Sequence, residues 1–380
     1  MSLLQAGGNI TLSFSQSIQS SKRHIFIVGP LPPPIHGASV VTSRVVELLR
    51  LHEHTVVLCN MAPAETTIPI RYHFSRIIAF LKSLGKLRHV NRESNVYFSL
   101  SGGLGLIYDL LLVTFSRAFG VRFIFHHHSF AYFSESNWIF RTIIKVAGRN
   151  QMHLALCQTM ANRLHELYGS HLSCRVVSNI AFMEFPEPLG NCRSRRLQTL
   201  GYLSNISFEK GIDRFFDLIA LLQSRGIPIK AKLAGPFANA DVKKYSDARI
   251  SELDGVSYEG PVYGSAKDSF LHSIDLLVMP SRYRNEAEPL VIYEALSFGI
   301  PVAVTSRGCI PDMASPSVAF FLDQEAIDLS KLTEIISTWH RNDAEYQKVL
   351  SAVAEYMMSV AARSKFNREC FLSCLAPSSP

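Results

Sequence analysis

The chain of 380 residues lacks a hydrophobic run long enough to cross a membrane. Its most apolar stretch, residues 104–115, covers about half of the length that a membrane-spanning helix needs, and it contains Asp109. The N-terminus lacks a cationic start followed by an apolar core, so we expect no signal peptide and interpret residues 1–22 as a disordered leader. These absences predict a cytoplasmic protein that is soluble or bound peripherally at the inner face of the plasma membrane.

The sequence also lacks paired cysteines. Its seven cysteines are scattered, odd in number and form no C-x-x-C pair. This favours a reducing compartment and predicts a chain without structural disulfides or a zinc module. Neither the dinucleotide fingerprint G-x-G-x-x-G nor a P-loop ending in G-K-[ST] is present, which argues against nicotinamide and ATP chemistry.

Charge is distributed unevenly along the chain. Residues 1–182 contain 17 Lys and Arg and 7 Asp and Glu, a net of +10, whereas the remainder has 21 minus 24, a net of −3. The basic half is therefore expected to meet something anionic, either nucleic acid or an acidic membrane surface. No recognised nucleic-acid module accompanies the basic residues, so we expect no nucleic-acid partner.

A predicted helix over residues 71–93 concentrates this charge. It carries an apolar stripe that includes Phe74, Ile77 and Leu81, with basic side chains such as Lys82 and Arg88 around it. The composition is typical of a helix that binds an anionic membrane surface. An ordinary helix that packs its apolar stripe on a sheet and leaves a solvated basic face fits the same pattern, and both interpretations remain open here.

Strands and helices alternate along most of the chain. Near-continuous apolar runs are typical of buried parallel strands, and the helix after Gly37 has an apolar period of 3.6 residues. We therefore expect an α/β protein of two Rossmann-like, doubly wound domains. The expected bounds are 23–182 for the N-terminal domain, 183–192 for a linker, 193–360 for the C-terminal domain, and 361–380 for a C-terminal helix that could cross back to the N-terminal domain.

Three histidines, His126, His127 and His128, directly follow a predicted strand of the first domain. The carboxyl ends of parallel strands are where such sheets bind ligands, which favours a hydrogen-bonding or acid–base role. A structural role remains an alternative. A metal site is disfavoured because adjacent strand residues point to opposite faces, so at most two rings could converge.

The most informative stretch, residues 276–312, predicts a strand, a polar loop, a helix from about Pro289 and a second strand. Glu286 in the loop and Glu294 in the helix flank the helix N-terminus, whose free amides attract anions. Lys210 precedes another predicted helix start. Anion-binding amides beside carboxylates that accept hydroxyl hydrogen bonds would suit a ligand with phosphates and many hydroxyls.

These features together resemble the retaining glycosyltransferases of family 4, which have the GT-B fold. The resemblance rests on the proline-rich loop before Gly37, the segment SNISFEKG, and the E-x7-E pattern from Glu286 to Glu294 with Pro280-Ser281 upstream and Gly299 and Pro301-Val302 downstream. It covers nearly all of the chain after residue 23. It implies two domains that face each other across a cleft, a nucleotide diphosphate sugar as donor and a glycan or lipid-linked acceptor. With no D-x-D motif, transfer is expected to need no metal and no cofactor.

Carried over by position, the resemblance implies a role for each of several residues. Glu286 would bind the donor sugar, Glu294 the ribose and Lys210 the diphosphate. The amides of Leu290 and Val291 would face the phosphate or sugar. On the other domain, Gly37 would give room near the diphosphate, and His128 or His126 would lie beside the sugar.

Two segments depart from the family pattern. Asn205 stands where the family has an arginine, and Pro289 ends the loop Glu286-Ala287-Glu288-Pro289 where the family has E-G-F-G, which removes one amide donor. We hypothesise that Arg282 or Arg284 replaces the lost charge. The alternatives are a nucleotide-sugar epimerase and a non-catalytic sugar-nucleotide-binding or scaffolding subunit.

Overall fold

A computed structural model describes residues 23–63, 69–185, 196–324 and 328–376. Two parallel six-stranded sheets organise it, one in each half of the chain. The first has the order β2-β1-β3-β4-β5-β6. Its strands are β1 (His24–Gly29), β2 (Thr55–Asn60), β3 (Asn95–Leu100), β4 (Arg122–His127), β5 (Gln151–Ala155) and β6 (Cys174–Val176). The central strands β3 and β4 are almost entirely buried because helices cover both faces of the sheet.

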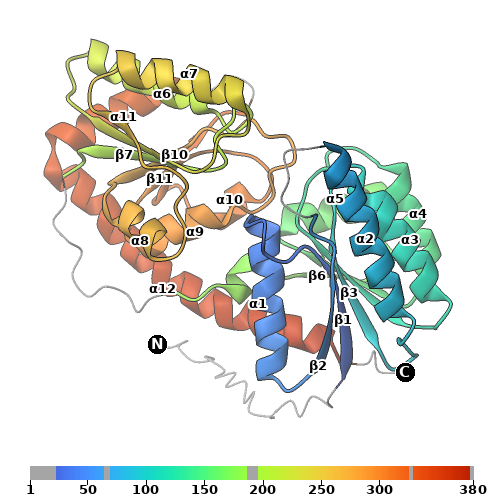
Figure 1. Ribbon diagram of the computed structural model, residues 1–380. Helices are drawn as coiled ribbons and strands as arrows, with labels where there is room; N and C mark the ends of the chain where they lie inside the picture. The colour runs from blue at the N-terminus through green and yellow to red at the C-terminus, as the bar shows by residue number, and fades with distance from the viewer. Residues whose placement is uncertain (1–22, 64–68, 186–195, 325–327, 377–380) are drawn as a thin grey trace, which may run out of the picture.

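Figure 1 shows α2, α3 and α4 together on the outer side of this sheet, with α1 on the other side. The helices and the 3₁₀ turn are α1 (Gly37–Leu51), α2 (Pro69–Leu87), α3 (Gly105–Arg117), α4 (Trp138–Ala147), α5 (Gln158–Tyr168) and η1 (Asn179–Phe182). On α3, the buried Asp109 accepts a hydrogen bond of 2.8 Å from the Ser101 amide, which explains how a carboxylate fits into this apolar helix. None of the helices in the described part of the chain has the length and apolar character that a membrane span requires.

The second sheet has the order β12-β11-β10-β7-β8-β9. Its strands are β7 (Thr199–Leu203), β8 (Lys230–Ala234), β9 (Val256–Tyr258), β10 (Leu276–Met279), β11 (Val302–Thr305) and β12 (Ala319–Leu322). Its helices are α6 (Ile212–Ser224), α7 (Ala240–Glu252), α8 (Ser265–His272), α9 (Leu290–Ser297), α10 (Ile310–Met313) and α11 (Leu329–Arg341). The predicted α/β class with two doubly wound domains is confirmed. The predicted leader and most of the predicted linker lie outside the described residues.

The last helix, α12 (Asp343–Cys374), joins the two domains. It starts on the second domain and ends beside the first sheet (Figure 1). There Phe371 and Cys374 pack in the same core as Tyr97. The side-chain amide of Asn95 donates to Leu375 O at 3.0 Å. The helix runs unbroken through residue 361, where the sequence suggested a boundary, because residues 343–374 contain neither proline nor glycine.

The prediction of a chain without structural disulfides is wrong. Cys157, which caps α5 in the first domain, is bonded to Cys309, which caps α10 in the second, across a separation of 152 residues. Both cysteines follow strands whose carboxyl ends face the other domain. No local spacing could reveal this pairing, since the two thiols meet only after both sheets have formed.

Candidate active site

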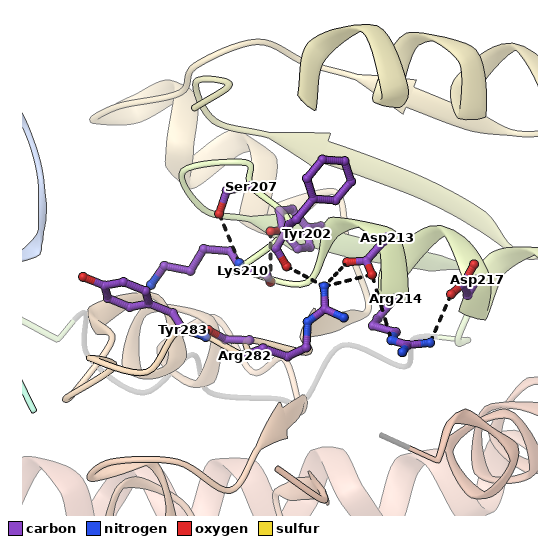
Figure 2. A network of polar contacts seen from close by, with 10 residues as sticks. Tyr202, Ser207, Lys210, Asp213, Arg214, Asp217, Arg282 and Tyr283 are labelled. Atoms are coloured by element: carbon purple, nitrogen blue, oxygen red, sulfur yellow. Dashed lines mark hydrogen bonds and ion pairs between the residues drawn. The ribbon is translucent and has the colours of Figure 1, made fainter. Parts of the chain in front are cut away.

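Glu286 and Lys210, which the sequence singled out separately, are in direct contact. The Glu286 side chain is 7% exposed and accepts hydrogen bonds from Lys210 Nζ at 2.6 Å and from Ser281 Oγ at 2.9 Å. Lys210 Nζ also lies 4.7 Å from the ring centroid of Tyr283, and the two side chains lie together in Figure 2. The loop after β10 and the turn before α6 therefore form one charged cluster.

Gly211 explains how Lys210 reaches this position. It caps α6 with a φ of 82°, a left-handed conformation that side chains disfavour. A Cβ on Gly211 would lie 2.1 Å from Pro280 O, so only glycine lets the turn approach the end of β10 this closely. The close approach brings the residue before Gly211 next to the Glu286 loop.

Glu294 forms a second lysine–carboxylate pair. Its Oε1 lies 2.5 Å from Lys267 Nζ, and the side chains are 20% and 30% exposed. Glu294 lies on α9 and Lys267 on α8. Sequence reasoning missed Lys267 because α8 is short and carries no motif; a basic residue in a helix just upstream of β10 was the only available signal.

Between the two carboxylates, α9 begins at Leu290 after the cap residue Pro289. Ile292 N donates to Pro289 O at 3.2 Å, so the amides of Leu290 and Val291 precede the first bond of the helix. Both residues are partly exposed. These amides lie where the sequence predicted an anion-binding helix start, and their role in binding stays a prediction.

The hypothesised substitute cations are paired elsewhere. Arg282 NH2 donates to both carboxylate oxygens of Asp213 on α6, at 2.8 and 2.9 Å, and its guanidinium points to that residue in Figure 2. Arg284 forms an ion pair with Glu135 of the first domain. Asn205 is exposed in the loop after β7. In this structure, neither arginine points to the Lys210–Glu286 pair.

The first domain contributes its loop before α1 and the end of β4. A Cβ on Gly37 would meet nothing within 4 Å, so the space before this residue is open. His128 has its pKa lowered to about 3 by burial and by neighbouring His36, the cap residue of α1. It is therefore neutral, and its buried Nε2 has no hydrogen-bond partner among the described residues. Sequence reasoning missed His36, for which a histidine in the loop before Gly37 was the only sign.

His126 lies behind His128, with ring centroids 4.1 Å apart. It is fully buried, and its Nδ1 is 2.6 Å from the hydroxyl of Tyr97. Burial holds its pKa well below the ordinary value, so it too is neutral. Its Nε2, like that of His128, is buried and has no hydrogen-bond partner among the described residues.

His127 points to the opposite face, as strand alternation predicts. Its Nε2 is 3.0 Å from His153 Nδ1, and the two rings are stacked in the core behind the sheet. The three histidines therefore do not converge. No group of three or more His, Cys, Asp or Glu side chains in the described ranges has the arrangement of a metal site.

The Glu286 loop is attached to the first domain at several points. Phe130 N donates to Asn285 O at 3.3 Å, and Cys309, which is bonded to Cys157, donates its amide to Ala287 O at 2.9 Å. Gly308, with a φ of 59°, lets the segment after β11 approach the loop that contains Glu286, because a Cβ on this residue would lie 2.2 Å from Glu286 O. A cavity of about 250 Å³, lined by side chains of both domains, opens beside these contacts.

Residues 195–355 match the family model described as glycosyl transferases group 1. No curated protein sequence matches the chain. Among solved structures, HepE of Anabaena in complex with UDP is similar, with a TM-score of 0.64, 17% identity and coverage of 93% of this chain and 100% of that chain. HepE in complex with UDP-glucose has a TM-score of 0.63, 18% identity and coverage of 92% and 99%. Sucrose-phosphate synthase of Thermosynechococcus elongatus has a TM-score of 0.63, 13% identity and coverage of 93% and 100%. The chain therefore has the GT-B fold, and residues 195–355 of its second half are similar to the glycosyl transferases of group 1.

Proposed function

We propose that the protein is a retaining glycosyltransferase of family 4 that moves a sugar from a nucleotide diphosphate sugar to a glycan or lipid-linked acceptor, in the synthesis of a bacterial-type polysaccharide or glycolipid. The donor would bind mainly to the second domain and the acceptor to the first. The UDP and UDP-glucose complexes of HepE, which has the same fold, support a nucleotide diphosphate donor.

The observation that carries this proposal is the pair of lysine–carboxylate contacts around the start of α9. Lys210–Glu286 at 2.6 Å and Lys267–Glu294 at 2.5 Å put two cations and two carboxylates beside free helix amides. Carboxylates accept paired hydroxyl hydrogen bonds, and ammonium groups and helix amides bind phosphate. A nucleotide diphosphate sugar offers both kinds of group in one molecule.

Each residue then has a role in transfer. Glu294 binds the ribose hydroxyls and Glu286 the hydroxyls of the sugar. Lys210 and the amides of Leu290 and Val291 stabilise the negative charge that grows on the diphosphate as its bond to the sugar breaks. Neutral His128 hydrogen-bonds the sugar from the first domain, with His126 behind it, and the open space before Gly37 receives the diphosphate.

Retention of configuration follows if the acceptor hydroxyl attacks from the face that the diphosphate leaves. The acceptor oxygen then forms the new bond to the sugar carbon as the bond to the phosphate oxygen breaks, and its proton passes to the departing diphosphate, so no enzymic nucleophile is needed. Lys210 can supply the charge stabilisation that a metal ion provides in other transferases, which supports transfer without a metal.

The departures from the family pattern bear on donor affinity. Asn205 is exposed and uncharged, and Arg282 is paired with Asp213, so the diphosphate would rely on Lys210 and the α9 amides. We propose that these groups suffice, aided by Lys267 near the ribose. Donor binding without turnover would instead favour the scaffolding subunit, and conversion of the free donor to another sugar would favour an epimerase.

Calorimetric titration of UDP-glucose and UDP in the presence of a chelator tests the proposal. Binding should weaken at least tenfold in Lys210→Ala, which removes the diphosphate cation, because a charge-assisted hydrogen bond is worth about 1.5–3 kcal/mol. The matched control is Lys243→Ala, which breaks a 2.6 Å ion pair with Asp247 on the exposed α7. Equal affinity in both variants would contradict the donor site.

We also propose that the protein is a cytoplasmic enzyme whose first domain binds an anionic membrane surface at the inner face of the plasma membrane. The apolar stripe of α2 is not fully packed, since Phe74 is 65% and Leu81 58% exposed. On the adjacent α3, Ile107 and Leu111 are exposed as well, and Trp138 at the start of α4 is 72% exposed. These side chains could enter the headgroup region of a bilayer.

Charge favours this surface over a purely packed helix. The helices α2, α3 and α4 contain seven Lys and Arg, and their single acidic residue, Asp109, is buried. The basic residues are Arg71, Arg76, Lys82, Lys86, Arg117, Arg141 and Lys145. Exposed apolar groups among cations match an anionic bilayer, where each cation contributes about 1 kcal/mol of attraction. A lipid-linked acceptor would then be reached from the membrane.

A further inference from the structure

Glu288 is a buried carboxylate that the roles above leave unused. It lies in the loop between β10 and α9, two residues after Glu286, and is 7% exposed. Nearly all of its partners belong to the segment that ends the first domain. Ser178 Oγ donates to its Oε1 at 2.5 Å, and Asn179 N donates to its Oε2 at 2.6 Å.

The same segment binds the loop a third time. The Asn179 side-chain amide donates to Glu288 O at 3.3 Å, so both the side chain and the backbone of Glu288 are held. Ser178 is itself fixed, because its amide donates to Asn367 Oδ1 of α12 at 2.9 Å. From the described part of its own domain, Glu288 receives a hydrogen bond from the hydroxyl of Tyr293, at 3.3 Å.

A carboxylate suits these partners better than an uncharged side chain. Two donors, one hydroxyl and one amide, converge on its two oxygens, and charge-assisted bonds of this kind are about twice as strong as neutral ones. Burial disfavours the charged form and raises the pKa of Glu288 to about 7, although the hydrogen bonds from Ser178 and Asn179 act to lower this pKa. Arg363 of α12 partly compensates the charge.

We propose that Glu288 is a positioning residue, which fixes the Glu286 loop of the second domain against Ser178 and Asn179 of the first and so aligns Glu286 with the acceptor side. This rests on the proposed function, and it assigns a task to one of the positions that differ from the family pattern. Since the first and second domains supply opposite sides of the reaction, the distance between them sets the geometry of transfer. A shift of about 1 Å can cost on the order of a hundredfold in rate.

The proposal predicts a division between turnover and binding. Glu288 contacts neither lysine of the donor site, so Glu288→Gln should leave the affinity for UDP-glucose within about twofold. The release of UDP from UDP-glucose, with water as the acceptor, should fall at least tenfold. Ser178→Ala removes one donor from the other domain and should lower turnover in the same way, whereas Tyr293→Phe, the matched control within the second domain, should not.

The pH profile separates positioning from a merely structural role. Around Glu288, the titratable and charged groups are Tyr293 from α9 and Arg363 from α12, while η1 offers only Ser178 O–H and Asn179 N–H. As the pH falls through about 7, the carboxyl becomes protonated and loses strength as an acceptor. Turnover of the wild type should therefore rise with pH through this range, and that rise should be absent in Glu288→Gln.

Hydrogen exchange at the Asn179 amide gives a readout that needs no substrate. Loss of the 2.6 Å bond should speed exchange of this amide in Glu288→Gln and leave it unchanged in Tyr293→Phe. Unchanged protection of Asn179, wild-type turnover of Glu288→Gln, or a parallel loss of UDP-glucose affinity would each overturn the proposal. A wild-type protein that does not bind UDP-glucose contradicts the proposed donor instead, and the exchange of Asn179 then decides the role of Glu288.

Discussion

Reduction of the Cys157–Cys309 disulfide is expected to destabilise the protein by about 5 kcal/mol. A cross-link stabilises chiefly by restricting the unfolded chain, and the effect grows with the length of chain that it closes. Here 152 residues separate the two cysteines, so the chain-entropy relation gives about 5 kcal/mol at 25 °C. The bond also joins two domains, so it limits their separation in partly unfolded states.

The expected shift of the thermal midpoint follows from the size of the chain. An unfolding entropy of about 2.1 cal/mol/K per residue gives about 0.8 kcal/mol/K for 380 residues. Dividing the two quantities predicts that the midpoint falls by roughly 6 °C on reduction. Calorimetry of the oxidised protein with and without a phosphine reductant measures this difference directly.

Two controls make the result decisive. Alkylation of the denatured, unreduced protein followed by mass spectrometry should leave Cys157 and Cys309 unmodified while labelling Cys174, which is a free thiol. The midpoint of the double variant Cys157→Ser/Cys309→Ser should not respond to the reductant. If the disulfide is intact and the wild-type midpoint is the same with and without reductant, the loop-entropy reasoning is refuted.

Three further predictions concern the donor site, the membrane surface and Glu288. Glu294→Ala should weaken UDP binding by 10- to 100-fold in calorimetry, since about 1.5–3 kcal/mol of charge-assisted hydrogen bonding to the ribose is lost, whereas Glu252→Ala on the exposed α7 should bind normally. Phe74→Ser and Leu81→Ser should reduce co-sedimentation with phosphatidylserine vesicles without lowering stability, because both side chains are exposed. Added salt should weaken binding of the wild type to the vesicles. Equal partitioning of variants and wild type would contradict the membrane surface. Between pH 4.5 and 7 the folded state keeps a proton on Glu288 that the unfolded state releases. Rising pH should therefore lower the free energy of unfolding of the wild type by up to about 3 kcal/mol, a loss that Glu288→Gln does not show. Parallel stability curves in urea would show that the pKa of this carboxyl is not raised.

The sequence predicted the sheets well because apolar runs report buried parallel strands directly. Helix α7 is hard to recognise from its sequence, since only Val242 and Ser246 of its side chains are buried, which leaves almost no apolar period. The stripe on α2 was recognised, but periodicity reports only that a helix is amphipathic. Whether another element covers the stripe depends on tertiary packing, and the structure leaves Phe74 and Leu81 exposed.

Within the candidate site, the residues that the sequence identified are those at strand ends and helix starts. Glu286 and Lys210 meet because the loops after β10 and β7 leave the same edge of one sheet. Their additional partners could not be predicted, because Lys267 lies on a helix without a motif. Glu288 and Cys309 have their partners in the other domain, where only the relative placement of two folded sheets decides which side chains touch.

The effects of the disulfide and of the Glu288 hydrogen bonds on the Glu286 loop should be separable by experiment. Reduction breaks the bond between Cys157 and Cys309 but leaves the hydrogen bonds of Glu288 and of Asn285 O to the first domain intact. A reduced protein below its thermal midpoint should therefore release UDP from UDP-glucose at the oxidised rate, although it unfolds more readily. Glu288→Gln should show the reverse, slow turnover with the disulfide in place. If reduction alone slowed turnover as much as Glu288→Gln does, the disulfide rather than the carboxylate would align the loop.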